Sequence, residues 1–125
     1  MKMNLKDIRV LGIDPGFDRL GVCIIEKKGG KETLLYSSCL LTNKKDLFEQ
    51  RLGFLGDALI SIIETYKPKE LAMEKIFFTT NQKTVIGVAS VRGVCLYLAH
   101  IYGLSVFEYS PPKIKLSVAG HGKAN

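Results

Sequence analysis

The sequence has only three cysteines among its 125 residues, and none lies in a Cys-x-x-Cys motif or beside a histidine. Cys23, Cys39 and Cys95 each lie in an apolar run. We therefore expect reduced, buried thiols of a cytoplasmic protein, and neither metal ligands nor nucleophiles. Proline and glycine are also few, with 4 and 12 residues, and they are scattered along the chain. This excludes collagen-like and low-complexity chains.

Long uncharged runs are also lacking. The stretch from Gly93 to Phe107 is 15 residues long and contains His100 and Gly103, which predicts no membrane span there. The amino-terminal residues are charged and run directly into a predicted strand, so no secretory signal is expected. We accordingly expect no membrane partner.

Acidic residues are scarce after Glu74, where Glu108 is the only one. Residues 1–74 hold 12 Lys/Arg and 11 Asp/Glu, whereas residues 75–125 hold 6 Lys/Arg. The whole chain has a formal net charge of +6 at pH 7. A nearly neutral first part followed by a basic second part indicates a polyanionic partner. The alternative is a basic surface that serves only solubility.

The length predicts one domain, residues 1–125. Asn43 is expected to cap an amphipathic helix that ends before Pro68. A second helix over 81–102 is apolar nearly all round, and another begins after Ser110. Short apolar runs predict strands at 8–13, 21–26, 33–41, 71–74 and 104–109. This order predicts an α/β fold, in which an antiparallel meander is continued by parallel strands, with helices on both faces.

Two carboxylates stand at the ends of predicted strands, Asp14 after the first and Glu74 at the end of the fourth. Reactive groups of open α/β sheets cluster at strand ends, so these two could converge on a divalent metal. A pair of Mg²⁺ ions about 3.5–4 Å apart can promote phosphodiester cleavage. From spacing alone, an Asp14 that serves only the turn and a solvated Glu74 are an equally good alternative.

The local sequences around both carboxylates form an ordered set of motifs. The set comprises Leu11-Gly12-Ile13-Asp14-Pro15-Gly16, Gly21, Ala72-Met73-Glu74-Lys75-Ile76-Phe77, Asn81, Arg92-Gly93 and Val106-Phe107-Glu108-Tyr109. It resembles the RuvC family of Holliday-junction resolvases from about Ile8 to Gly122. The resemblance implies a ribonuclease H-like fold with a mixed five-stranded sheet. It also implies an endonuclease that cleaves four-way junction DNA in recombination and repair, using Mg²⁺ or Mn²⁺, with two ions per active site in the complete protein.

The resemblance also implies roles for individual residues. Asp14 and Glu74 would be metal ligands, and Lys115 would lie near the scissile phosphate, where a cation offsets developing charge. Phe77 corresponds to an aromatic that stacks on bases at the junction centre; the simpler alternative is that both Phe77 and Phe78 are core residues. Further candidate phosphate contacts, chosen by charge alone, are Arg19, Lys75, Lys83, Arg92, Lys113 and Lys123.

Two kinds of protein partner follow from the resemblance. The family is homodimeric through the helix that corresponds to residues 81–102, which fits the unusual apolarity of this segment. The alternative is that another helix of the same chain covers it. Branch-migration motor proteins are the second expected partner.

One departure from the family pattern concerns the carboxyl end. Family members carry two further acidic metal ligands on a last helix, and this sequence stops before it, in the loop that Ala119–Asn125 matches. We therefore expect a truncated chain that cleaves DNA poorly or not at all, because two carboxylates hold Mg²⁺ weakly, while its full-length parent is active. His121 is expected to be a surface residue and not a substitute ligand.

Three alternative functions can be separated by experiment. A RuvX-like RNA-processing nuclease of the same fold would prefer structured RNA to branched DNA. A non-catalytic dimeric junction-binding module would bind DNA without metal, with an affinity that survives Asp14→Asn. An actin-like phosphotransferase would use residues 12–16 as a phosphate loop, but it needs a second domain and a longer chain.

Overall fold

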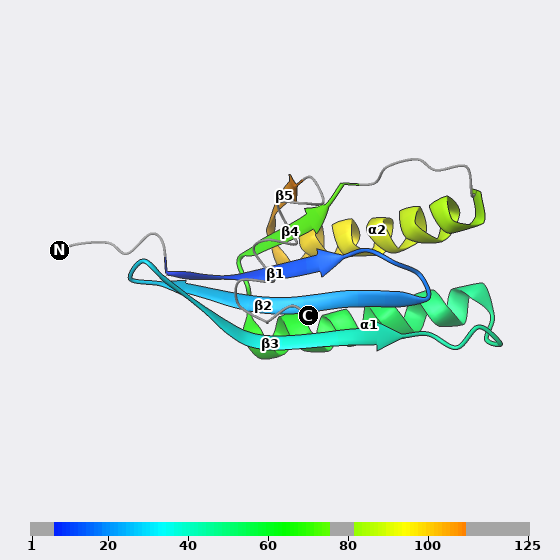
Figure 1. The fold of residues 1–125 in the computed structure, drawn as a ribbon, viewed down its shortest axis with the longest axis horizontal. Helices are drawn as coiled ribbons and strands as arrows, with labels where there is room; N and C mark the ends of the chain where they lie inside the picture. The colour runs from blue at the N-terminus through cyan, green and yellow to red at the C-terminus, as the bar shows by residue number, and fades with distance from the viewer. Residues whose placement is uncertain (1–6, 76–81, 110–125) are drawn as a thin grey trace.

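A computed structural model describes residues 7–75 and 82–109 of the chain (Figure 1). Strands β1 (Ile8–Asp14), β2 (Arg19–Lys28) and β3 (Lys31–Leu41) come first and are followed by helix α1 (Phe48–Tyr66). Strand β4 (Glu70–Glu74), helix α2 (Gln82–Tyr102) and strand β5 (Ser105–Tyr109) complete the described part. This order confirms the prediction. The helix expected after Ser110 lies outside the described residues.

The five strands form one mixed sheet in the order β3-β2-β1-β4-β5. The β1–β2 and β2–β3 pairs are antiparallel, whereas β1–β4 and β4–β5 are parallel. Gly29 and Gly30 make the turn between β2 and β3 with φ of +58° and +79°. Glycine adopts these values without steric cost, which explains the pair at this position.

Both described helices pack on the same face of this sheet (Figure 1), whereas the sequence predicted helices on both faces; within residues 7–75 and 82–109 neither helix covers the other face. Leu11 and Ile13 of β1 and Leu71 and Met73 of β4 join residues of α1 and α2 in one buried cluster. Because successive side chains of a strand point to opposite faces, the residues between them face away from the helices. This alternation decides which face carries the strand-end carboxylates.

The start of α1 differs from the prediction that Asn43 caps it. The Asn43 side chain accepts a hydrogen bond from the Lys45 N–H at 2.9 Å, and its carbonyl accepts one from the Asp46 N–H at 3.0 Å. Asn43 thus closes a separate turn, as short polar side chains often do. The helix begins at Phe48, where the Gln50 side chain accepts a hydrogen bond from the Leu47 N–H at 3.0 Å.

Helix α2 is buried along one side only. Val91 and Cys95 lie in the core, whereas Ile86, Tyr97 and Ile101 are 59%, 62% and 52% exposed. Within residues 7–75 and 82–109, no second helix covers this exposed side. By length and composition alone, the segment Thr84–Tyr102 could cross a membrane. The prediction of no membrane span considered only the uncharged stretch from Gly93 to Phe107, so it left out Arg92 and the apolar residues before it.

The cysteine prediction is right for two residues and wrong for the third. Cys23 and Cys95 are buried, and burial raises the pKa of Cys23 and raises that of Cys95 to about 12. Cys39 is exposed, because its side chain lies on β3, the edge strand of the sheet. All three thiols are free.

Candidate active site

Asp14 and Glu74 lie next to each other at the carboxyl ends of the adjacent parallel strands β1 and β4. The parallel register pairs Ile13 of β1 with Met73 of β4, and each carboxylate follows one residue later. Ile13 and Met73 are 1% and 0% exposed on the helix side, so alternation turns both carboxylates to the opposite face. Neighbouring strands are about 4.8 Å apart, a separation at which two carboxylates can share one cation.

Gly21 makes room for Asp14 on the other side. The two residues pair across β1 and β2, and a Cβ placed on Gly21 would lie 3.2 Å from the Asp14 Cβ. It would also lie 3.9 Å from Oδ2 of Asp14. Glycine at position 21 therefore leaves space for the exposed Asp14 carboxylate on the β2 side. Glu74 lies on the other side of Asp14, on β4.

Strand β5 lies beside β4, on the side away from β1. Tyr109 pairs with Glu74, and the Lys75 N–H donates to the Tyr109 carbonyl at 2.9 Å. Lys75 is exposed immediately after Glu74, and Arg19 is exposed at the start of β2. Both cations are thus available to an anionic ligand near the carboxylates.

Arg92, another candidate phosphate contact, is engaged within the protein. It lies on α2 and forms an ion pair with Glu108 of β5, and its side chain is 20% exposed. Glu108 precedes Tyr109 and therefore points to the helix face, away from Glu74. The only acidic residue of the basic second part is thus held by Arg92.

Several predicted site residues cannot be placed in this geometry. Lys83 belongs to α2, but its side chain lies outside the described part. The other residues outside it are Phe77, Phe78, Lys113, Lys115, His121 and Lys123. Across 7–75 and 82–109, no three His, Cys, Asp or Glu side chains form a metal-binding group. Two carboxylates provide the oxygen ligands that Mg²⁺ prefers, but they are a partial set.

The loop after Asp14 is held by residues that the sequence analysis missed. Its Phe17 packs against Gly87 of α2, and Thr42 and Arg51 bind its backbone and side chains. The sequence carried no signal for these contacts, because they join segments that lie far apart in the chain.

A mixed five-stranded sheet of this order is the ribonuclease H-like fold, and two carboxylates at the carboxyl ends of adjacent parallel strands fit the metal-dependent phosphodiester nucleases of that fold. Within that class, the family model described as crossover junction endodeoxyribonuclease RuvC matches residues 10–125. The chain therefore belongs to the RuvC family of hydrolytic nucleases.

Individual relatives agree with this assignment. The crossover junction endodeoxyribonuclease RuvC of Petrotoga mobilis is 41% identical over 115 residues, which cover 92% of this chain and 71% of the relative. A solved Thermus thermophilus RuvC is 28% identical with a TM-score of 0.78, covering 94% of this chain and 73% of that one. The T. thermophilus RuvC in complex with Holliday junction substrate is 22% identical and has a TM-score of 0.81, covering 94% and 83%. The last comparison concerns the fold alone.

Proposed function

We propose that this chain is the nuclease domain of an endonuclease that resolves four-way DNA junctions. The observation that carries the proposal is that Asp14 and Glu74 each follow one member of a buried residue pair, Ile13 and Met73, on the adjacent parallel strands β1 and β4. A T. thermophilus relative of the same fold has been solved with a Holliday junction substrate, which supports the choice of DNA. The preponderance of Lys and Arg after Glu74 also supports a polyanionic substrate.

The proposed cofactor is Mg²⁺, with Mn²⁺ as a substitute and two ions in a complete site. Bound at the carboxylates, the cation would lower the pKa of a water molecule and stabilise charge on the phosphate. Asp14 and Glu74 would bind and orient it, and Lys115 would offset negative charge near the scissile phosphate. Hydrolysis breaks one P–O bond of the backbone and adds water across it, leaving a phosphate on one end and a hydroxyl on the other.

Contacts with the rest of the junction are assigned to cations near the strand ends and to one aromatic. Lys75 and Arg19 are exposed beside the carboxylates and would contact phosphates. Phe77 would stack on a base at the junction centre. The remaining phosphate contacts proposed are Lys83, Lys113 and Lys123.

A second copy of the chain is the proposed partner for the exposed side of α2. Its exposed Ile86, Tyr97 and Ile101 form an apolar surface on a helix whose other side is core. A dimer would cover this surface and present two active sites to opposed strands of one junction. Branch-migration motor proteins are further partners by family resemblance, and three free thiols fit a cytoplasmic location.

Metal-dependent cutting of a labelled four-way junction tests the proposal, with linear duplex and structured RNA as competing substrates. We expect nicking of the junction that Asp14→Asn and Glu74→Gln abolish. Asp57→Asn is the matched control, because Asp57 is an exposed aspartate on α1. Preference for RNA would favour an RNA-processing nuclease. Metal-independent junction binding without cutting, unchanged by Asp14→Asn, would favour the binding module and contradict the proposal.

A further inference from the structure

The loop of residues 15–18 leaves β1 directly after Asp14 and crosses to the helix side of the sheet. There the Phe17 ring lies 4.7 Å from the Phe48 ring of α1, measured between centroids. A Cβ placed on Gly87 of α2 would lie only 2.8 Å from the Phe17 Cβ. Phe17 therefore fills the seam between the first turn of α1 and the second turn of α2.

Arg51 of α1 joins this loop to the end of β3. Its Nε and Nη2 donate to the Thr42 hydroxyl oxygen at 3.1 and 2.9 Å, and Nη2 also donates to Asp18 Oδ1 at 2.5 Å. Its guanidinium carbon lies 4.0 Å from the centre of the Phe17 ring. The Arg51 side chain is only 12% exposed, so solvent competes little for these contacts.

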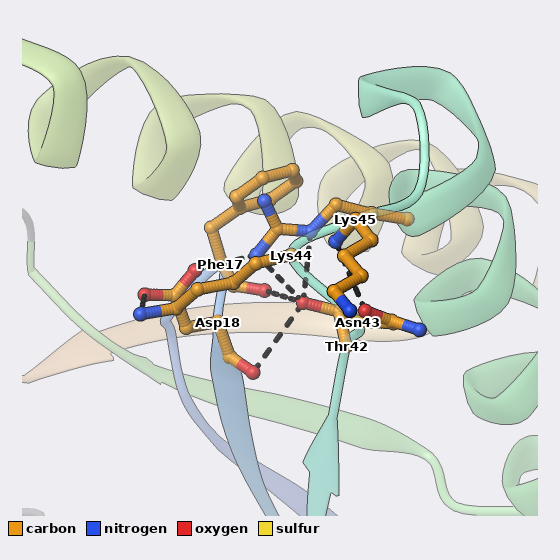
Figure 2. A network of polar contacts seen from close by, with 7 residues as sticks. Phe17, Asp18, Thr42, Asn43, Lys44 and Lys45 are labelled. Atoms are coloured by element: carbon orange, nitrogen blue, oxygen red, sulfur yellow. Dashed lines mark hydrogen bonds and ion pairs between the residues drawn. The ribbon is translucent and has the colours of Figure 1, made fainter.

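Thr42, which Arg51 contacts, is itself hydrogen-bonded to the loop backbone, as the dashed lines in Figure 2 show. Its hydroxyl donates to the Phe17 carbonyl at 2.9 Å, and its N–H donates to the Asp18 carbonyl at 2.9 Å. With one proton to donate, the hydroxyl also accepts from Arg51. One planar guanidinium thus orients Thr42, Asp18 and the Phe17 ring together, which the single ammonium of lysine cannot do.

The place of these Arg51 and Thr42 contacts in the fold, relative to Asp14 and Glu74, indicates what they do. The loop that they hold starts at Asp14, and the helix against which Phe17 packs is the next element after Glu74. We propose that Arg51 is a positioning residue for the metal site: it fixes the loop after Asp14 between α1 and α2, and so holds Asp14 beside Glu74. This inference rests on the proposed function, since it requires that the two carboxylates bind a cation.

The test measures Mn²⁺ affinity at the carboxylates in chain 1–125 by paramagnetic broadening of the Ile13, Asp14 and Gly21 amide signals. Arg51→Met should raise the apparent Kd for Mn²⁺ by about tenfold, the lower end of what outer partners of metal ligands contribute. Arg51→Lys should not restore the affinity, because it keeps the charge but lacks the planar fork.

Arg9→Met is the matched control for lost stability. Arg9 lies on the same strand as Asp14 but at its other end, and it donates to Glu26 Oε2 at 3.1 Å and to the Tyr66 carbonyl at 2.9 Å. Its replacement should lower the melting temperature without changing the Kd for Mn²⁺.

The outcomes separate this inference from the proposed function. An unchanged Kd in Arg51→Met, equal weakening by Arg9→Met, or full rescue by Arg51→Lys would each overturn the positioning role. A wild-type chain in which Mn²⁺ broadens none of these signals, or broadens them equally after Asp14→Asn, would overturn the metal site and the positioning role with it.

Discussion

Gly21 and Asp14 face each other across β1 and β2, so closely that a Cβ on Gly21 would press on Asp14. A Cβ there would lie 3.2 Å from the Asp14 Cβ, so Asp14 would have to move by a few tenths of an ångström. The absent side chain of one residue thus sets the position of a carboxylate on the next strand.

Gly21→Ala should therefore weaken metal binding more than its effect on folding suggests. We expect a loss of stability of about 1–3 kcal/mol, typical of overpacking, together with a raised Kd for Mn²⁺. Urea denaturation and the amide broadening measure the two effects. Gly53→Ala on α1 is the control, since nothing lies within 4 Å of its added Cβ. It should stabilise the helix by about 0.5–1 kcal/mol and leave metal affinity unchanged. Normal affinity in Gly21→Ala would contradict this account.

The contact between Gly87 and Phe17 predicts energetic coupling between α2 and the β1–β2 loop. Gly87→Ala places a methyl group 2.8 Å from the Phe17 Cβ and should destabilise the protein. Phe17→Ala alone should also destabilise it, and it removes the Cγ and Cδ2 atoms that lie 3.0 and 3.3 Å from the added methyl group. In the double mutant the losses should not add, with a coupling of about 0.5–3 kcal/mol. Strict additivity in urea denaturation would show that the seam relaxes independently of Phe17.

Burial predicts that the three thiols react at very different rates. With its pKa raised to about 12, Cys95 stays a neutral thiol at pH 8, and burial acts on Cys23 in the same direction. A thiol disulfide reagent should therefore modify one cysteine per folded chain quickly, and Cys39→Ser should remove that fast phase. In denaturant all three should react. Two fast thiols in the folded protein would be inconsistent with the described packing.

The exposed side of α2 predicts a dimer that a single charge disrupts. Tyr97→Glu should raise the dimer Kd by about 30-fold or more, because an unpaired buried charge costs about 2 kcal/mol or more. Sedimentation velocity over a concentration series measures this. Phe54→Glu is the matched control, because Phe54 is an aromatic on α1 that is 51% exposed. A monomeric wild-type chain, or an equal effect of both changes, would argue against this interface.

The small set of acidic ligands predicts slow chemistry by chain 1–125. Only Glu108 follows Glu74, and it is paired with Arg92, so water must supply most ligands of a bound cation. We expect junction cleavage slower by about 100-fold or more than that of the Petrotoga mobilis relative under the same conditions. Comparable rates would show that Asp14 and Glu74 suffice.

The sequence predicted the elements well because their signals are local. Alternating or periodic apolar residues, Gly29-Gly30 and Pro68 mark strands, a turn and a helix end within a few residues of each other. Asn43 was misassigned because the same side chain can cap a turn or a helix, and only the neighbouring N–H groups decide between them. Cys39 was misassigned because an apolar run does not reveal whether its strand lies at the edge of the sheet.

The candidate site was predicted only in part. Asp14 and Glu74 were identified from their positions at strand ends, and the parallel register confirms that they are neighbours, while their role in metal binding stays a prediction. Arg51 and Thr42 could not be identified, since their partners Phe17 and Asp18 lie 24 or more residues earlier in the chain. Contacts of this kind follow from tertiary packing and leave no periodic trace in the sequence.

The parallel pairing of β1 with β4 also makes the site sensitive to how the chain folds. Ile13 and Met73 are 60 positions apart, whereas the meander of β1, β2 and β3 closes through short turns. A chain in which only the meander had formed would hold Asp14 without its partner. A slip of β4 by one residue would turn Glu74 to the wrong face. Misfolded or partly folded molecules would therefore be unable to cut DNA.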